Sequence, residues 1–134
     1  MSDVARIPIV KLYDALLVSI QVALSDRMVM HLKEDICQAI GRLKPKGLII
    51  DLSGIDVMDS YISRAIRDIG LISKLMGVRT VVCGMDPMIA ITLVEMGLAL
   101  EGLQTAMNLE SAFQLLRRPI LKGDSARSRI RGRL

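Results

Sequence analysis

The spacing of apolar positions changes several times along the 134-residue chain, and each change predicts a new element. Apolar-rich segments at 7–13 and 16–20, separated by a turn at 14–15, predict a hairpin, and Pro8 confines its first strand to a sheet edge. The runs at 48–52 and 78–84 are almost entirely apolar and have strand length, which suits strands covered on both faces.

Between these strands, apolar residues recur every three or four positions, the spacing of an amphipathic helix. Ser25 is expected to cap the first helix, which the sequence Lys44-Pro45-Lys46-Gly47 ends. A second helical pattern follows Ser60, which is expected to act as its N-cap, and Gly77 is expected to follow its C-terminus.

Two shorter helices complete the pattern. The first is expected to begin at Asp86-Pro87 and to end at Gly97, and Asn108 is expected to cap the second, which ends before Pro119. A short strand is expected between them at 103–106. Strands that alternate with helices predict an α/β fold, with a mixed, mostly parallel β-sheet, an N-terminal hairpin and flanking helices.

The composition is that of one domain with a well-filled core. Hydrophobic residues make up 51% of the chain. No apolar run approaches the roughly 20 residues that a membrane-spanning helix needs. The N-terminus lacks the basic and apolar regions of a secretory signal. A cytoplasmic protein without a membrane partner is therefore expected.

The net charge of +4 comes entirely from the C-terminal segment. Residues 122–134 contain five basic residues and one acidic residue, whereas residues 1–121 contain thirteen of each. We predict a domain at 1–121 and a basic, disordered tail at 122–134, to which no function is assigned. A neutral domain argues against nucleic-acid binding, because phosphate contacts need clustered lysines and arginines.

The residues needed for common catalytic chemistry are missing from the sequence. His31 is the only histidine and is expected on a helix surface, and Cys37 and Cys83 are expected to be small core residues. This set predicts no metal site and no histidine-based triad. Glycine-rich phosphate-binding loops are also absent, and no cofactor is predicted.

The loop at 53–60 follows a buried strand and places Asp56, Asp59 and Ser60 just before a helix. Functional groups gather at such strand ends in parallel sheets. A phosphate on Ser60 would be favoured by the helix dipole and opposed by the two carboxylates, and it could block partner docking. Residue chemistry alone favours the simpler interpretation, in which Asp59-Ser60 is an ordinary helix cap.

Several separated segments resemble RsbS-type proteins, which are single-STAS-domain relatives of anti-anti-sigma factors found in stressosomes. They are 7–13 with 16–21 at the N-terminus, 49–60 with its Asp-Ser at a helix start, 73–77, and 94–101. The resemblance extends over residues 5–118 and implies a STAS fold. Tyr61 after the serine and the tail from Lys122 onward depart from the family pattern.

The resemblance also implies a function without catalysis. Ser60 would be the phosphoacceptor, and Asp56, Met58, Asp59 and Tyr61 would belong to the kinase-facing surface. The implied partners are an RsbT-type serine kinase that is sequestered until phosphorylation releases it, RsbR-type STAS proteins in a large complex, and an RsbX-type phosphatase.

Two alternatives remain at this point. The chain could be an anti-anti-sigma factor that binds an anti-sigma factor directly and also uses Ser60. An enzyme or ligand carrier that uses Asp51, Asp56 and Asp59 would need a pocket or metal site that the sequence does not predict. Modification of Ser53, Ser63 or Thr92 also stays open.

Overall fold

The computed structural model describes residues 6–21, 24–97, 100 and 102–118. Nine elements follow one another in the order expected from the sequence. They are β1 (Ile9–Leu12), β2 (Ala15–Ser19), α1 (Asp26–Leu43), β3 (Gly47–Asp51), α2 (Ser60–Leu75), β4 (Arg79–Cys83), α3 (Pro87–Glu95), β5 (Gln104–Ala106) and α4 (Leu109–Arg117). Pro119 and the segment 122–134 lie outside the described residues, so the predicted tail stays a prediction.

The five strands form one mixed sheet in the order β1-β2-β3-β4-β5. The β1–β2 hairpin is antiparallel, and every other neighbouring pair is parallel. Ala15, Gly47 and Arg79 lie side by side, so β2, β3 and β4 begin at one end of the sheet and finish at the other. The mixed, mostly parallel sheet predicted from the sequence is thereby confirmed.

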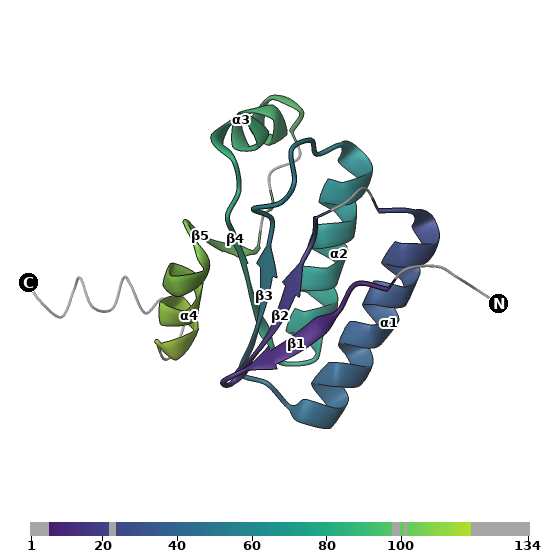
Figure 1. The fold of residues 1–134 in the computed structure, drawn as a ribbon, viewed down its shortest axis with the longest axis vertical. Helices are drawn as coiled ribbons and strands as arrows, with labels where there is room; N and C mark the ends of the chain where they lie inside the picture. Colours follow the sequence, from purple (N-terminus) through teal and green to yellow (C-terminus); the bar gives the residue numbers. More distant parts are fainter. Residues whose placement is uncertain (1–5, 22–23, 98–99, 101, 119–134) are drawn as a thin grey trace, which may run out of the picture.

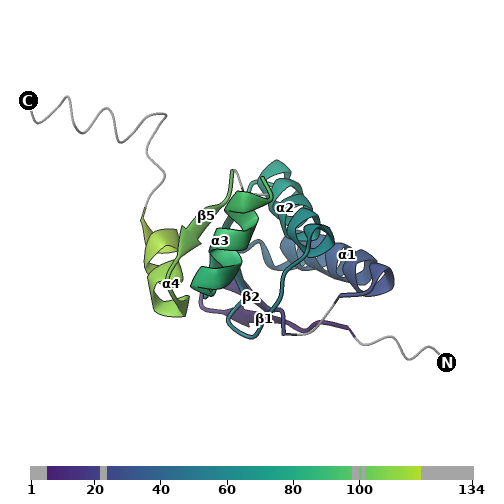
Figure 2. The same ribbon diagram turned by 90° about the horizontal axis from the view of Figure 1, so that it is seen from above.

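Helices cover both faces of the sheet, as Figures 1 and 2 show. α1 and α2 lie side by side on one face, α4 lies on the other, and α3 lies across the end at which β3 and β4 finish. This arrangement explains why β3 and β4 are almost continuously apolar, because each has a helix on either side.

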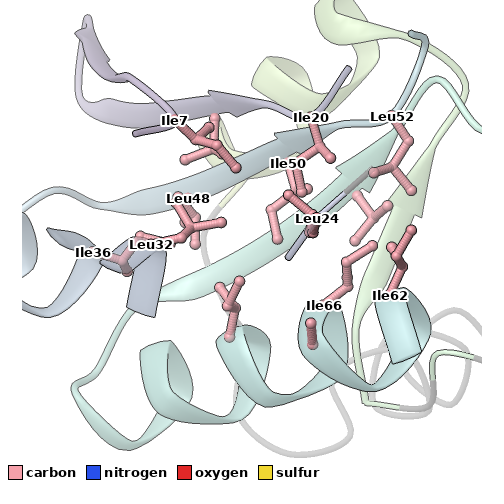
Figure 3. Packing of buried hydrophobic residues seen from close by; sticks show 14 of the residues in the cluster. Ile7, Ile20, Leu24, Leu32, Ile36, Leu48, Ile50, Leu52, Ile62 and Ile66 are labelled. Atoms are coloured by element: carbon pink, nitrogen blue, oxygen red, sulfur yellow. The ribbon is translucent and has the colours of Figure 1, made fainter. Parts of the chain in front are cut away.

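The larger part of the core lies between the sheet and the α1–α2 layer (Figure 3). Leu32 and Ile36 of α1 and Ile66 of α2 pack there against Leu48 and Ile50 of β3. All five are at most 1% exposed, and each buried side chain of this size contributes roughly 1.5–3 kcal/mol of transfer free energy. A smaller cluster on the opposite face packs against α4.

The lone histidine and the two cysteines have structural positions. Cys83 is buried and Cys37 is half-buried, and both are free thiols. His31 is half-buried rather than fully on the helix surface, and its Nδ1 has no hydrogen-bond partner among the described residues. None of the helices described is long and apolar enough to cross a membrane.

Candidate phosphoacceptor site

The loop between β3 and α2 is attached to the core at every third residue. Leu52, Ile55 and Met58 are 0%, 6% and 5% exposed and belong to the main core cluster. The residues between them face solvent, and Val57 is 76% exposed. The loop therefore presents Asp56 and Val57 on a fixed base.

Met58 does not belong to the exposed surface, and the expectation that it does is wrong. Its side chain fills the core beneath the loop, two residues before α2 begins. Burial in the core removes this apolar side chain from water in the free domain, and the favourable transfer free energy keeps it there. Asp56, Asp59 and Tyr61 are exposed, so these three remain available for contact with another protein.

Hydrogen bonds hold the start of the same loop. Asp51 Oδ1 accepts from the Ser53 amide at 3.0 Å, and the Leu52 amide donates to the Cys83 carbonyl at 2.9 Å. Gly84 has a φ of +75°, and a Cβ there would lie 2.7 Å from Asp51 Oδ1. This position therefore needs glycine, both for its backbone conformation and for the close approach of the aspartate.

Asp59, and not Ser60, is the N-cap of α2. Its Oδ1 accepts from the Ile62 amide at 2.9 Å, and its backbone is extended, whereas Ser60 is the first helical residue. The prediction that Ser60 caps the helix is wrong because the carboxylate one residue earlier occupies that role. The Ser60 hydroxyl is half-buried and has no hydrogen bond to any part of the chain that the structure describes.

The alternative hydroxyls differ in how accessible they are. Ser63 is 2% exposed and its Oγ donates to the Asp59 carbonyl at 3.0 Å. Thr92 Oγ1 donates to the Met88 carbonyl at 2.9 Å. Ser53 is exposed at the start of the loop. Ser63 is therefore enclosed, whereas Ser53 is exposed and Ser60 and Thr92 are both half-buried. Of these last two, only Thr92 uses its hydroxyl in a hydrogen bond among the described residues.

Three aspartates lie around the start of α2, against the exposed Arg64 one turn along the helix. Asp56 and Asp59 flank Ser60 in sequence, and Asp26 of α1 reaches Tyr61. Desolvation, the hydrogen bond and charge of Asp26, and then the charge of Asp59 raise the pKa of Tyr61 above 10.0. Tyr61 therefore stays a neutral hydroxyl at physiological pH. The two helices thus share an acidic margin that a phosphate would strengthen.

Cys83 lies at the end of β4, next to the same loop. Burial, and secondarily the charge of Asp51, raise the pKa of its thiol to about 11. A thiol with so high a pKa is a weak nucleophile near neutral pH. Within the described residues there is also no group of three or more His, Cys, Asp or Glu side chains that could hold a metal ion.

The class of protein follows from the fold and from a comparison with known families. The STAS domain family matches residues 6–112, which is most of the chain. The chain therefore belongs to the STAS domain family. The mixed five-stranded sheet and the loop before α2 described above both lie within the matched segment.

Solved structures and a curated relative narrow the similarity to stressosome proteins. A variant of Moorella thermoacetica RsbS with one serine replaced by glutamate is 38% identical, with a TM-score of 0.73, and the match covers 84% of this chain and 96% of that one. A chain in the molecular architecture of the stressosome, described as a signal integration and transduction hub, is 39% identical with a TM-score of 0.73, over 82% and 96% of the two chains. The predicted resemblance to RsbS-type proteins is confirmed.

One of the curated relatives is the RsbT co-antagonist protein RsbRD of Bacillus subtilis (strain 168). It is 30% identical over 79 residues, which are 59% of this chain and 28% of the relative. The match therefore spans little more than a quarter of that longer protein.

Proposed function

We propose that this STAS domain is a non-catalytic phosphorylation switch in a cytoplasmic stressosome. In this proposal it sequesters an RsbT-type serine kinase and releases it when the kinase phosphorylates Ser60. RsbR-type STAS proteins would assemble with it into the large complex, and an RsbX-type phosphatase would reset the serine.

The position of Ser60 is the observation that carries this proposal. Its hydroxyl lies on the first turn of α2, is half-buried rather than enclosed, and is not used as a cap because Asp59 has that role. Phosphorylation would therefore remove no hydrogen bond found among the described residues. The added charge would lie at the positive end of a 16-residue helix, which favours it.

The effect of the phosphate would be on the partner rather than on the fold. Asp56 and Asp59 already make the exposed surface acidic, and a phosphate adds roughly 1.5–2 further negative charges at neutral pH. A kinase surface that can bind next to two carboxylates would then lie next to a much larger negative charge. Docking would weaken while the core beneath, anchored by Leu52, Ile55 and Met58, stays unchanged.

The names of the relatives support the stressosome assignment over a direct anti-anti-sigma role. The RsbRD protein is named a co-antagonist of RsbT, and the 39% identical chain comes from a stressosome. The glutamate that replaces a serine in the RsbS variant is a carboxylate in place of a hydroxyl, which is the charge change that phosphorylation makes.

The test is phosphorylation with the cognate RsbT-type kinase and ATP, followed by mass-spectrometric site mapping. One phosphate on Ser60 is expected, and Ser60→Ala should fold normally, bind the kinase and accept none. Ser53→Ala is the matched control, since it removes an exposed serine hydroxyl of the same loop and should leave phosphorylation unchanged. Phosphorylation of Ser60→Ala at wild-type stoichiometry would contradict the site.

A binding experiment separates charge from side-chain size. Ser60→Asp should weaken kinase capture, although only partly, because a carboxylate lacks the second charge and the geometry of a phosphate. Asparagine has nearly the same shape as aspartate but carries no charge, so Ser60→Asn should retain the wild-type affinity for the kinase. Equal affinities for all three proteins would argue against an electrostatic switch.

A further inference from the structure

The charged side chains of the domain are divided unevenly between the two ends of the sheet. The acidic end, at which β3 and β4 finish and α1, α2 and α3 begin, has Arg27 and Arg64 nearby and carries five aspartates: Asp26, Asp51, Asp56, Asp59 and Asp86. The basic end, at the opposite pole of the sheet (Figure 1), carries six basic side chains: Lys44, Lys46, Lys74, Arg79, Arg117 and Arg118. A ligand at the basic end would therefore lie at the other end of α2 from Ser60.

A hollow of about 320 Å³ opens at the basic end, where α2 ends and β4 and β5 begin. Its wall is mostly apolar and includes Val78 and Leu103. Leu103 packs directly onto the backbone of α2, because residue 70 is glycine and a Cβ there would collide with the leucine side chain. A mostly apolar cavity with a few polar groups is typical of small-molecule sites, and the volume is near the lower limit of about 300 Å³ for such sites.

Two cations line the hollow, and among the described residues no carboxylate does. Lys74 is exposed and forms no ion pair in the described part of the chain. The Arg79 guanidinium donates to the carbonyls of Leu115 and Arg118 at 3.1 and 2.9 Å, and to Gln104 Oε1 at 3.0 Å. Because these acceptors are uncharged, they fix the guanidinium without neutralising it. The hollow is therefore positively charged and favours an anion.

A buried hydroxyl that borders the hollow has no partner. Thr80 is 6% exposed, and its Oγ1 forms no hydrogen bond with any described residue. Thr80 lines the hollow and lies two residues before Val82, on the face of β4 that α2 covers. Ser73 also has an unpartnered hydroxyl, but it does not line the hollow. Burial of a hydroxyl without a partner costs stability, so a ligand that bonds to Thr80 would recover this loss.

The helix dipole explains only part of this arrangement. Lys74 lies in the last turn of α2, where the dipole favours a cation and opposes an anion. The last carbonyls of the helix are already occupied, because those of Ile72, Ser73 and Lys74 accept from the amides of residues 76, 78 and 77. The Lys74 ammonium group is thus available to a ligand. Neither the dipole nor apolar packing accounts for the unpartnered hydroxyl of Thr80.

We propose that this hollow binds a small organic acid. The Lys74 ammonium group and the Thr80 hydroxyl donate to its carboxylate, and Arg79 adds a fixed positive charge. The apolar part of the acid lies against Val78 and Leu103. Hydrogen bonds to a charged group are stronger than neutral ones, and a wall that is already formed needs little rearrangement on binding. Binding stabilises the folded domain by mass action. This inference does not depend on the proposed kinase switch.

The test is a titration of the isotopically labelled full chain with sodium benzoate and with sodium hexanoate, followed by NMR of the backbone amides. Both acids should bind saturably with a Kd of about 1 mM or lower, and the largest shifts should occur at residues 78–80 and 102–104. Benzamide has the ring of benzoate without the charge and should bind at least about tenfold more weakly.

Four substitutions separate the carboxylate contacts from the general charge of the basic end. Lys74→Gln should weaken benzoate binding at least about tenfold, because it removes the charged partner. Lys46→Gln is the matched control, since it removes another exposed lysine of the basic end that does not line this hollow, and it should leave the affinity unchanged. Thr80→Val should weaken binding and raise the unfolding temperature of the ligand-free protein, because a methyl group replaces the unpartnered hydroxyl. Thr80→Ser keeps the hydroxyl and should still bind benzoate.

Several results would overturn the proposal. They are the absence of saturable shifts with either acid, equal affinities of wild type and Lys74→Gln, and shifts confined to the apolar hollow of about 430 Å³ that Leu93 of α3 and Ala106 of β5 line. Inorganic phosphate is the last probe. Phosphate that binds as tightly as benzoate would also contradict the proposal, because the apolar wall would then contribute nothing to recognition.

Discussion

The acidic and basic ends of this domain are built from the same repeating unit and yet differ in almost every surface property. The connections that lead from β2, β3 and β4 into helices lie at the acidic end, which carries Asp26, Asp51, Asp56, Asp59 and Asp86. The connections from α1 to β3 and from α2 to β4 lie at the basic end, which carries Lys44, Lys46, Lys74 and Arg79. Helix starts favour aspartate and serine, and helix ends favour lysine and arginine. Parallel topology places the starts of α1, α2 and α3 at one pole and the ends of α1 and α2 at the other. Residues 1–121 carry no net charge, but after folding their negative and positive side chains are concentrated at opposite ends of the sheet.

The two ends also differ in how their surfaces are held in place. The acidic loop is fixed by buried side chains at every third residue, whereas the basic end is held by close backbone approach and by the hydrogen bonds of Arg79. The predictions below test this difference.

The largest expected effect is the loss of a loop anchor at the acidic end. Met58→Ala should lower the free energy of unfolding by about 2–5 kcal/mol, because it removes a buried side chain and leaves a cavity. Val57→Ala, one residue earlier and 76% exposed, should stay within about 0.5 kcal/mol of wild type. Urea unfolding measures both. Equal losses would mean that the loop is not anchored in the core as described.

The next effect concerns the chemical reactivity of Cys83, close to the acidic loop. Its pKa of about 11, against 9.0 for an ordinary thiol, lowers the thiolate fraction about 100-fold below pH 9. Alkylation at pH 8 should therefore be at least about 100-fold slower in the native than in the unfolded protein. Because the folded protein holds this proton more tightly, the associated stability is present below pH 9 and is lost as the pH rises through about 11.

Mass spectrometry of each alkylated cysteine follows the two thiols separately, and half-buried Cys37 serves as the internal comparison. Equal rates for Cys83 in native and unfolded protein would contradict its burial.

At the basic end, the corresponding test is a change at a glycine. A Cβ at Gly47 would collide with the Leu116 side chain of α4, so Gly47→Ala should cost about 1–3 kcal/mol. Gly41→Ala is the matched control, because no atom lies within 4 Å of its Cβ and alanine is favoured in a helix by about 0.5–1 kcal/mol. Thermal unfolding should therefore move in opposite directions for the two variants. The same sign for both would contradict the close packing of α4 on β3.

The smallest expected effect separates the two aspartates of the loop. Asp59→Ala removes the N-cap of α2 and should cost about 1 kcal/mol. Asp56→Ala removes an exposed carboxylate and should change the stability by less than about 0.5 kcal/mol. Chemical denaturation resolves the difference, and a larger loss at Asp56 would show that the assignment of the cap is wrong.

The elements were predictable because their signals are local. Periodicity located the helices, and the caps at Ser25, Asp86 and Asn108 were recognised from residue type and position. The cap of α2 was misassigned because Asp59 and Ser60 are adjacent and both suit the position, so that only the backbone conformation separates them. The prediction that Ser60 is the phosphoacceptor comes from the family resemblance and not from residue chemistry.

Two further features depend on contacts across the fold. Burial of Met58 follows from what lies beneath the loop, and a single apolar residue between exposed ones carries no periodic signal. The separation of charge needs the topology as well as the sequence, because Lys46 and Arg117 become neighbours only when α4 packs against the sheet.

In the loop before α2 every third residue is buried and the residues between are exposed, and this pattern has a consequence for how such domains diversify. Positions 52, 55 and 58 contribute to stability, whereas the side chains at positions 53, 56 and 57 face outward and contribute little to it. Gly54 is excluded from this second set, because a Cβ there would lie 2.8 Å from the Gln21 side chain. Substitutions can accumulate at the second set without eroding the first. Gene copies that arise by duplication can thus acquire separate recognition specificities while keeping one shared architecture.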